Sequence, residues 1–420
     1  FNKYFMALEV ENDVPNLNLL ADALKVALTQ LDDDAAASDA VKDLVRRLVM
    51  HLARHDPDAA LAWANDWLLD DTRDAALVQI ARSLTQRSPA EGLQVVAQIA
   101  APLRRMQGLA AVGGIWARTD SAAALRWAAA LLRPTEQALA LNSVLLTLAH
   151  GDARAAAAEL AAHERRMAED YRARYERDLA AMNLTPADLA NAPEKYRELL
   201  EAGALPPPTS PDVELLAEAA RVIASRLGET GDRMGAAWAE SLNNDLLRLH
   251  AARGALAGWS HVDPAAAVAY FNDHYASYPE LVGSLYENWA AADAANAAAG
   301  TRLLGDAALR ATAVESVASA WATRDSTGAA NWLDQLPATD RTDAARLAVV
   351  YGLAETQPAQ AWSRALQIQD SALQYRGLKA AFANLLTQDV NQARRLLESS
   401  PLTPRINERL LDVLREVEGG

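Results

Sequence analysis

The 420-residue chain carries a formal net charge of −15, contains no cysteine and is 51% hydrophobic. The negative charge argues against a nucleic-acid partner, which requires a basic face, and no run approaches the ~20 apolar residues that span a bilayer. The absence of cysteine excludes disulfides, cysteine-ligated zinc, thiol catalysis and iron–sulfur clusters.

Residues 1–40 are predicted to form N-terminal capping helices. Their acidic run Asp32-Asp33-Asp34 lacks the further oxygen ligands that a calcium loop needs at set spacing, so it is interpreted as a loop that leads into the start of a helix. Just downstream, His51 and His55 stand four residues apart, a spacing that can bind a metal on one helix, but no third ligand lies nearby in sequence. No metal site and no cofactor are therefore predicted.

From residue 41 onward the sequence repeats itself. Equivalent positions, here called marks, form two runs, one from Asp56 to Asp152 and one from Gly231 to Asp389; within each run they are 32 residues apart, with one step of 30 between Asp263 and Asp293. The marks are Asp56, Ser88, Asp120, Asp152, Gly231, Asp263, Asp293, Asp325, Gln357 and Asp389. A fixed period in this range is typical of a stacked-repeat protein.

Hydrophobic residues recur at constant offsets from the marks. The fourth residue before each mark is always leucine or tryptophan, and the eighth is always apolar. The seventh residue after the mark is usually large and apolar, with exceptions at Glu159, Gly300 and Arg364. These offsets predict two helices per repeat: the first begins at the mark, where Asp or Ser caps it, and the second ends just before the next mark.

This register explains the two tryptophans of WATRDSTGAANWLDQLP, residues 321–337. Trp321 closes one repeat, at a position that leucine occupies elsewhere, and Trp332 lies in the first helix of the next repeat. Both are therefore interpreted as structural. Replacing Trp321 with alanine is expected to destabilise the protein without removing a ligand contact.

The pattern over roughly residues 40–400 resembles the tetratricopeptide-like αα-hairpin repeats, with HEAT-type repeats as the neighbouring possibility. The resemblance is architectural, because the period is 32 rather than about 34 and the family's Trp-Leu-Gly-Tyr spacing is not reproduced. It implies an all-α, right-handed α-solenoid of about ten helical hairpins that binds proteins or peptides. The expected blocks are residues 41–162 and 211–400, followed by a C-terminal capping helix at 401–420.

An insertion interrupts the register between Asp152 and Gly231. We expect residues 163–210 to form a projecting helical hairpin, here called the arm. A helix of about 30 residues without a breaker precedes a shorter helix that Thr185 caps and that Pro193 restarts. That helix should end at Gly203, and the proline-rich LPPPTSP, residues 205–211, should return the chain as an extended strap.

An apolar stripe runs along the long helix of the arm, at Leu160, Met167, Tyr171, Tyr175, Leu179 and Met182. In one interpretation this stripe only packs against the second helix of the arm. In the other, Met167, Tyr171, Tyr175 and Tyr196 also contact a partner or a second copy of the chain, which would form a homodimer through the arm. These four residues are the candidate binding site.

The preferred function is a non-catalytic scaffold that binds a protein or peptide, with a basic partner favoured by the negative charge. The sequence contains no Gly-rich phosphate loop, no Gly-x-Ser-x-Gly and no His-Glu-x-x-His. The alternative is an α-superhelical enzyme or accessory region that acts on the cell wall or another polymer. That alternative would need a catalytic domain of about 100 residues, and the repeats leave no stretch of that size.

The sequence starts at Phe1 rather than at methionine, and its first residues do not show the charged and apolar regions of a secretory leader. We expect an upstream segment to have been removed. Together with the lack of cysteine, this favours a bacterial cell envelope or periplasm over the cytoplasm.

Overall fold

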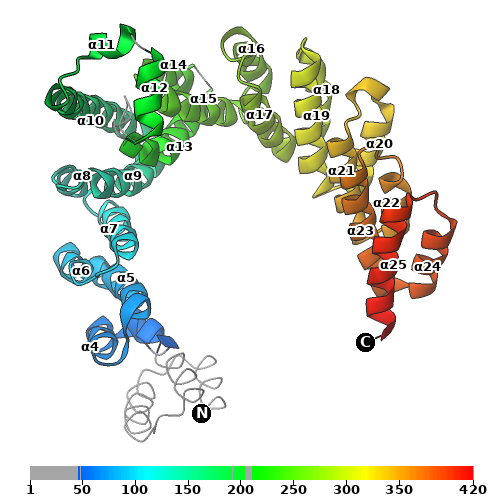
Figure 1. Ribbon diagram of the computed structural model, residues 1–420, viewed down its shortest axis with the longest axis horizontal. Helices are drawn as coiled ribbons and strands as arrows, with labels where there is room; N and C mark the ends of the chain where they lie inside the picture. The colour runs from blue at the N-terminus through cyan, green and yellow to red at the C-terminus, as the bar shows by residue number, and fades with distance from the viewer. Residues whose placement is uncertain (1–45, 48, 192, 204–210, 232, 420) are drawn as a thin grey trace, which may run out of the picture. The chain divides into compact units, whose positions relative to one another are not determined.

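The computed structural model describes residues 46–47, 49–191, 193–203, 211–231 and 233–419 of the chain. Every regular element in these ranges is a helix, so the predicted all-α class is confirmed (Figure 1). None of the described helices is both long enough and apolar enough to cross a membrane. The predicted capping helices at 1–40, with the run Asp32-Asp33-Asp34, lie outside the described residues, as does nearly all of the predicted strap.

The chain divides into two compact units. Unit 1 comprises Phe1–Ile223 and Ser241–His250, and unit 2 comprises Ala224–Glu240 and Ala251–Gly420. The predicted boundaries at residues 41, 163, 211 and 401 stay predictions.

In unit 1 successive long helices pack against one another, and shorter helices alternate with them along the chain. The long helices α5 (Asp70–Arg87), α7 (Pro102–Trp116) and α9 (Pro134–Gly151) pack in series. The shorter α4 (Pro57–Trp67), α6 (Pro89–Val96) and α8 (Ser121–Ala129) contact the long helices next to them in sequence. The insertion follows as α10 (Ala153–Ala181), α11 (Pro186–Asn191), α12 (Pro193–Glu201) and the 3-10 helix η1 (Pro211–Leu216).

Unit 2 shows the same alternation. Its long helices α17 (Pro279–Ala292), α19 (Ala307–Ala322), α21 (Asp343–Ala354) and α23 (Ser371–Gln388) pack in series (Figure 1). Between them along the chain lie α18 (Ala294–Gly300), η2 (Thr301–Leu303), α20 (Ser326–Gln335), η3 (Ala338–Asp340) and α22 (Pro358–Ala365). Helix α16 (Pro264–His274) precedes them, and α24 (Val390–Ser399) and α25 (Pro404–Gly419) follow them. The remaining helices are α13 (Ala217–Gly228), α14 (Met234–Ser241) and α15 (Asp245–Ser260); the division between the units passes through all three.

The aspartates at the marks cap the first helices as predicted. In seven repeats the carboxylate accepts a hydrogen bond of 2.8–3.1 Å from the backbone N–H three residues on, at Asp56, Asp120, Asp152, Asp263, Asp293, Asp325 and Asp389. Such a bond satisfies one of the amides that a helix start leaves free. The predicted helix start at Gly231 was wrong: that residue has a φ of 77°, and α14 begins only at Met234.

The register positions form the core. The residues eight before a mark are fully or almost fully buried at Ile80, Val112, Val144, Ile223, Ala255, Leu285, Val317, Val349 and Ala381. At three joints the aromatic residue four before the mark packs on the one seven after it: Trp116 on Trp127, Trp259 on Tyr270, and Trp321 on Trp332. Gly300 is small, although the seventh residue after a mark is usually large and apolar. The reason is steric, since a Cβ there would lie 2.1 Å from the Trp289 ring. The indole occupies the space of the missing side chain.

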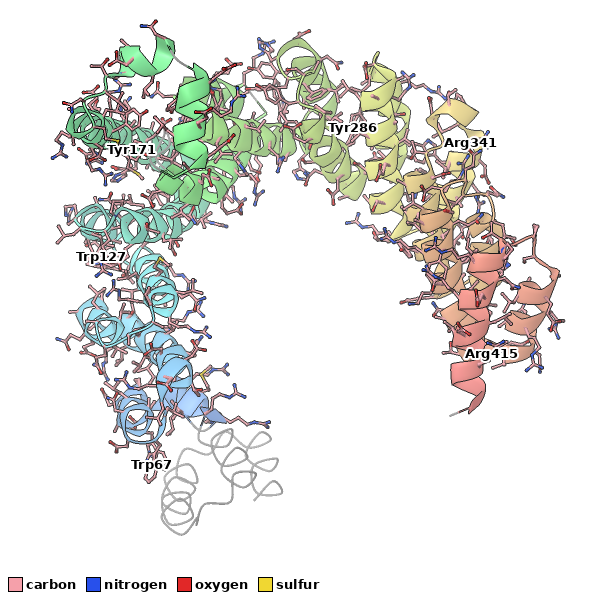
Figure 2. The ribbon with its side chains drawn as sticks, in the orientation of Figure 1. Trp67, Trp127, Tyr171, Tyr286, Arg341 and Arg415 are labelled. Atoms are coloured by element: carbon pink, nitrogen blue, oxygen red, sulfur yellow. The ribbon has the colours of Figure 1, made fainter. Side chains whose placement is uncertain are left out.

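A polar contact that could not be seen in the sequence joins the two helices of several hairpins. A side chain in or just before the first turns of the second helix donates to the carbonyl eleven residues after the mark. The pairs are Gln137 to Leu131, Arg248 to Leu242, Arg310 to Leu304, Arg341 to Leu336 (Arg341 is labelled in Figure 2) and Gln374 to Ile368. Carbonyls near a helix end lack intrahelical partners, so these bonds satisfy them.

We expect Trp321→Ala to lower the free energy of unfolding by about 2 kcal/mol, because the half-buried indole packs on Trp332 with ring centroids 5.9 Å apart. Trp321→Leu should lose less than half as much, since leucine fills this position in other repeats. Urea unfolding followed by circular dichroism measures both variants. An alanine variant as stable as the parent would refute the structural role of Trp321.

Candidate functional site

The long helix of the arm is present as predicted. Helix α10 runs without interruption from Ala153 to Ala181, and Asp152 caps its start. Of the predicted apolar stripe, Leu160, Met167 and Leu179 are buried. Met182, in contrast, is exposed at the end of the helix, so its place in the packed stripe was predicted wrongly.

The second part of the arm also follows the sequence signals. The backbone N–H of Asp188 donates to the Thr185 hydroxyl, and the N–H of Thr185 donates to the Asp188 carboxylate, which forms a reciprocal cap. A new helix starts at Pro193. Gly203 has a φ of 66°, the left-handed conformation expected after a helix end.

The four predicted site residues lie near one another along the arm. Met167 is 8% exposed, while Tyr171, Tyr175 and Tyr196 are partly exposed. Tyr171, labelled in Figure 2, stacks on Tyr175 with ring centroids 6.4 Å apart and planes at 16°. Burial and a hydrogen bond with Tyr196 raise the pKa of Tyr175 to about 12, so this phenol is neutral at physiological pH.

A small core of Leu179 and Leu189 holds the two parts of the arm together. Tyr175 and Tyr196 both pack against it. The stripes of the arm therefore pack on each other, as the simpler interpretation expects. Whether Met167, Tyr171, Tyr175 and Tyr196 also contact a partner stays a prediction.

A cavity of about 390 Å³ lies at the base of the arm, inside unit 1. One wall is a single face of α10, from Glu164 through Tyr171 and Tyr175 to Glu176. The facing wall includes Val213 of η1 together with Asn243 and Asn244, which precede α15. We call this space the arm-base cavity.

Glu164 links α10 to the chain segment beyond the insertion. Its side chain is almost entirely buried, and its Oε1 accepts a 2.5 Å hydrogen bond from the backbone N–H of Asn244. Asn244 in turn accepts from the N–H of Leu247 in the first turn of α15. No sequence signal pointed to Glu164, because its partner lies 80 residues further along the chain.

Beside Glu164, His163 is also buried. Burial, and to a smaller extent the charge of Arg166, lowers the pKa of His163 to about 4 from its ordinary value of 6.5. The Oε2 atom of Glu159 lies 3.9 Å from Nε2 of His163, and the pKa of His163 is lowered despite this nearby carboxylate. The imidazole is therefore neutral in the folded protein at neutral pH.

This shift predicts a stability loss in acid. Below about pH 6.5 the unfolded chain binds a proton at His163, whereas the folded chain does so only near pH 4. The free energy of unfolding should therefore fall as the pH falls through this window, by up to about 1.4 kcal/mol per pH unit. Urea unfolding at pH 7.5 and 5.0 should show a smaller difference for His163→Gln than for the parent. The exposed His150→Gln is the control, and an unchanged pH dependence in His163→Gln would contradict the prediction.

A second hollow lies entirely in unit 2, where α19, α21 and α23 lie side by side. It has a volume of about 760 Å³, and we call it the long-helix groove. Small residues such as Ser319, Ala348 and Gly352 contribute to its surface. Tyr351 of α21 lines the groove and is 43% exposed, and Arg376 and Glu355 add charges of opposite sign.

The histidine pair considered in the sequence lies on the surface of unit 1. The rings of His51 and His55 are 4.9 Å apart between centroids. Burial, followed by the neighbouring charges of His55 and Arg54, lowers the pKa of His51. Among the described residues, no group of three or more His, Asp or Glu side chains could hold a metal ion.

Comparison with known proteins yields no assignment for this chain. No protein-family model matches the sequence, and no curated protein matches it. The functional argument therefore depends on the repeat register, the arm-base cavity and the long-helix groove.

Proposed function

We propose that the chain is a non-catalytic α-solenoid of tetratricopeptide-like or HEAT-like hairpins that binds a protein or peptide partner through the long-helix groove and the arm. The main support for this proposal is the long-helix groove. It crosses three consecutive long helices and combines a surface of small residues with an exposed aromatic side chain, Tyr351. Hollows with aromatic anchors are common sites of peptide recognition.

The chemistry of the groove fits a peptide better than a small polar metabolite. Ser319 and Ala348 leave room for a main chain to approach the helices, and Tyr351 offers a stacking surface. The flanking Glu355 and Arg376 can fix the direction of a peptide through its charges. With a net charge of −15, the chain as a whole favours a basic or neutral partner over nucleic acid.

The remaining parts of the proposal concern assembly and location. A homodimer formed through the arm is the alternative to a foreign partner, and light scattering distinguishes the two. We place the protein in a bacterial cell envelope or periplasm in preference to the cytoplasm.

The alternative function is an α-superhelical enzyme or accessory region that acts on a polymer. It predicts turnover of peptidoglycan, and an acidic-residue substitution should abolish that turnover.

Display selection with a library of 16-residue peptides on the full chain tests the proposal. We expect enriched peptides to bind with micromolar Kd, and Tyr351→Ser to weaken those that use the groove by about tenfold. Tyr278→Ser is the matched control, because Tyr278 is also a unit 2 tyrosine that is 43% exposed, and it lies outside the groove. Failure to enrich any peptide, or equal effects of the two substitutions, would overturn the groove as a binding site.

A further inference from the structure

The arm-base cavity has an acidic end that the structure holds in place. Glu164 is 2% exposed and lines the cavity. Its Oε1 is fixed by the N–H of Asn244, and no hydrogen bond found among the described residues uses its second oxygen. A buried carboxylate gains from a charged donor in the cavity, because its remaining lone pairs are otherwise poorly solvated.

The other charged residues of the cavity leave the acidic character in place. Glu176 lies twelve residues along α10 from Glu164, on the same helix face, and is exposed. Arg172 also lines the cavity but is exposed, and it takes part in none of the ion pairs found within the described residues. The cavity therefore carries two carboxylates and one guanidinium, and Arg172 and Glu164 form no ion pair with each other within the described residues.

Between the two carboxylates, the cavity wall is aromatic. Tyr171 and Tyr175 lie one helical turn apart and stack on each other. The guanidinium carbon of Arg174, from the same helix, lies 5.7 Å from the centroid of the Tyr171 ring. This intramolecular contact is a cation–π interaction, the type of contact that a guanidinium makes with a tyrosine ring.

We propose that the arm-base cavity binds an arginine side chain of the partner peptide. The guanidinium stacks against the tyrosine wall and donates to the second oxygen of Glu164, and the rim carboxylate of Glu176 adds attraction. Arginine fits better than lysine, because its planar fork both stacks on aromatic rings and forms paired hydrogen bonds with a carboxylate. This inference rests on the proposed function, since it specifies one residue of the partner.

Binding of single amino-acid derivatives to the full chain tests the inference. Saturation-transfer NMR titrations would use N-acetyl-argininamide, the uncharged isostere N-acetyl-citrullinamide and N-acetyl-lysinamide. We expect the arginine derivative to bind at least about tenfold more tightly than the citrulline derivative, and more tightly than the lysine derivative. Equal binding of arginine and citrulline would overturn the inference, and equal binding of arginine and lysine would overturn the assignment to arginine.

Charge-removing variants locate the site. Glu164→Gln keeps an acceptor for the Asn244 amide, so the fold should be retained, and thermal unfolding checks this. Glu164→Gln and Glu176→Gln should each weaken the arginine derivative by about fivefold or more. Glu169→Gln is the matched control, because Glu169 is an exposed glutamate of α10 that does not line the cavity, and its affinity should stay within about twofold. Equal effects of the three substitutions would contradict the site.

The same reagents separate this inference from the proposed function. In one outcome the selected peptides bind the chain, but the arginine derivative does not bind and the two cavity variants bind the peptides as tightly as the parent does. The inference then fails and the scaffold function stands. Specific arginine binding without any selected peptide would instead support the cavity as an arginine site and overturn the groove as a peptide site.

Discussion

Replacing Trp362 with alanine is expected to lower the free energy of unfolding of unit 2 by about 3–5 kcal/mol. Trp362 of α22 is 1% exposed, and it is among the largest side chains that the fold buries completely. Its ring lies 5.7 Å from that of Phe382 in α23, and its Nε1 donates a 2.8 Å hydrogen bond to the Ser400 hydroxyl. Alanine removes all of these contacts and leaves a cavity between neighbouring helices.

Guanidinium unfolding followed by circular dichroism measures this loss, and hydrogen exchange locates it. The lost contacts join α22 to α23 and to Ser400 at the end of α24, so amides of these three helices should lose most protection. Trp362→Phe is the control, because it keeps an aromatic ring against Phe382 while it removes the bond to Ser400 and a smaller part of the buried volume. We expect it to cost about 1 kcal/mol. An alanine variant that loses less than the phenylalanine variant would contradict the packing described here.

The second large effect is expected for Gly258→Ala in α15. A Cβ at this position would lie 2.0 Å from the backbone oxygen of Ser225 and 2.8 Å from its carbonyl carbon. These atoms belong to the backbone of α13, which cannot move aside as a flexible side chain can. The two helices would have to separate, and we expect a loss of about 3 kcal/mol or more.

Gly151→Ala is the matched control for Gly258→Ala. Gly151 is the last residue of α9, and a Cβ built there meets no atom within 4 Å. Alanine should therefore be neutral or stabilise the protein by about 0.5–1 kcal/mol, through the lower conformational freedom of the unfolded chain. Thermal and urea unfolding of the two variants side by side provide the test. Similar stabilities would refute the close approach of α13 and α15.

The local structure could be predicted from the sequence because it depends on local chemistry. Asp120 and Asp325 cap their helices through amides three residues away, and Val112 and Leu285 are buried because a helix brings every third or fourth residue to one face. Thr185 and Gly203 at the ends of the arm helices follow the same logic. Each of these inferences needs only a few consecutive residues.

The arm-base cavity and the close glycine contacts could not be predicted in this way. Glu164 meets Asn244 only after the insertion has folded back, and nothing in the spacing of the two residues indicates contact. Gly258 stands in a stretch that the repeat register identifies only as a boundary, while its function is to let another helix approach. The hydrogen bonds from the second helix to the carbonyl just after the first helix could not be predicted for a different reason. Different residue types donate them, arginine at Arg310 and glutamine at Gln374, so no residue pattern marks the contact.

Hydrogen exchange of the full chain, with and without a display-selected peptide, tests the central claim most directly. If the protein binds its partner through the long-helix groove and the arm, the backbone amides of α19, α21 and α23, the amides of the arm residues of α10, or both groups should exchange more slowly when the peptide is bound. The His51–His55 surface of unit 1 should exchange at the same rate with and without peptide. A bound peptide that protects neither the groove nor the arm would contradict the proposed scaffold function.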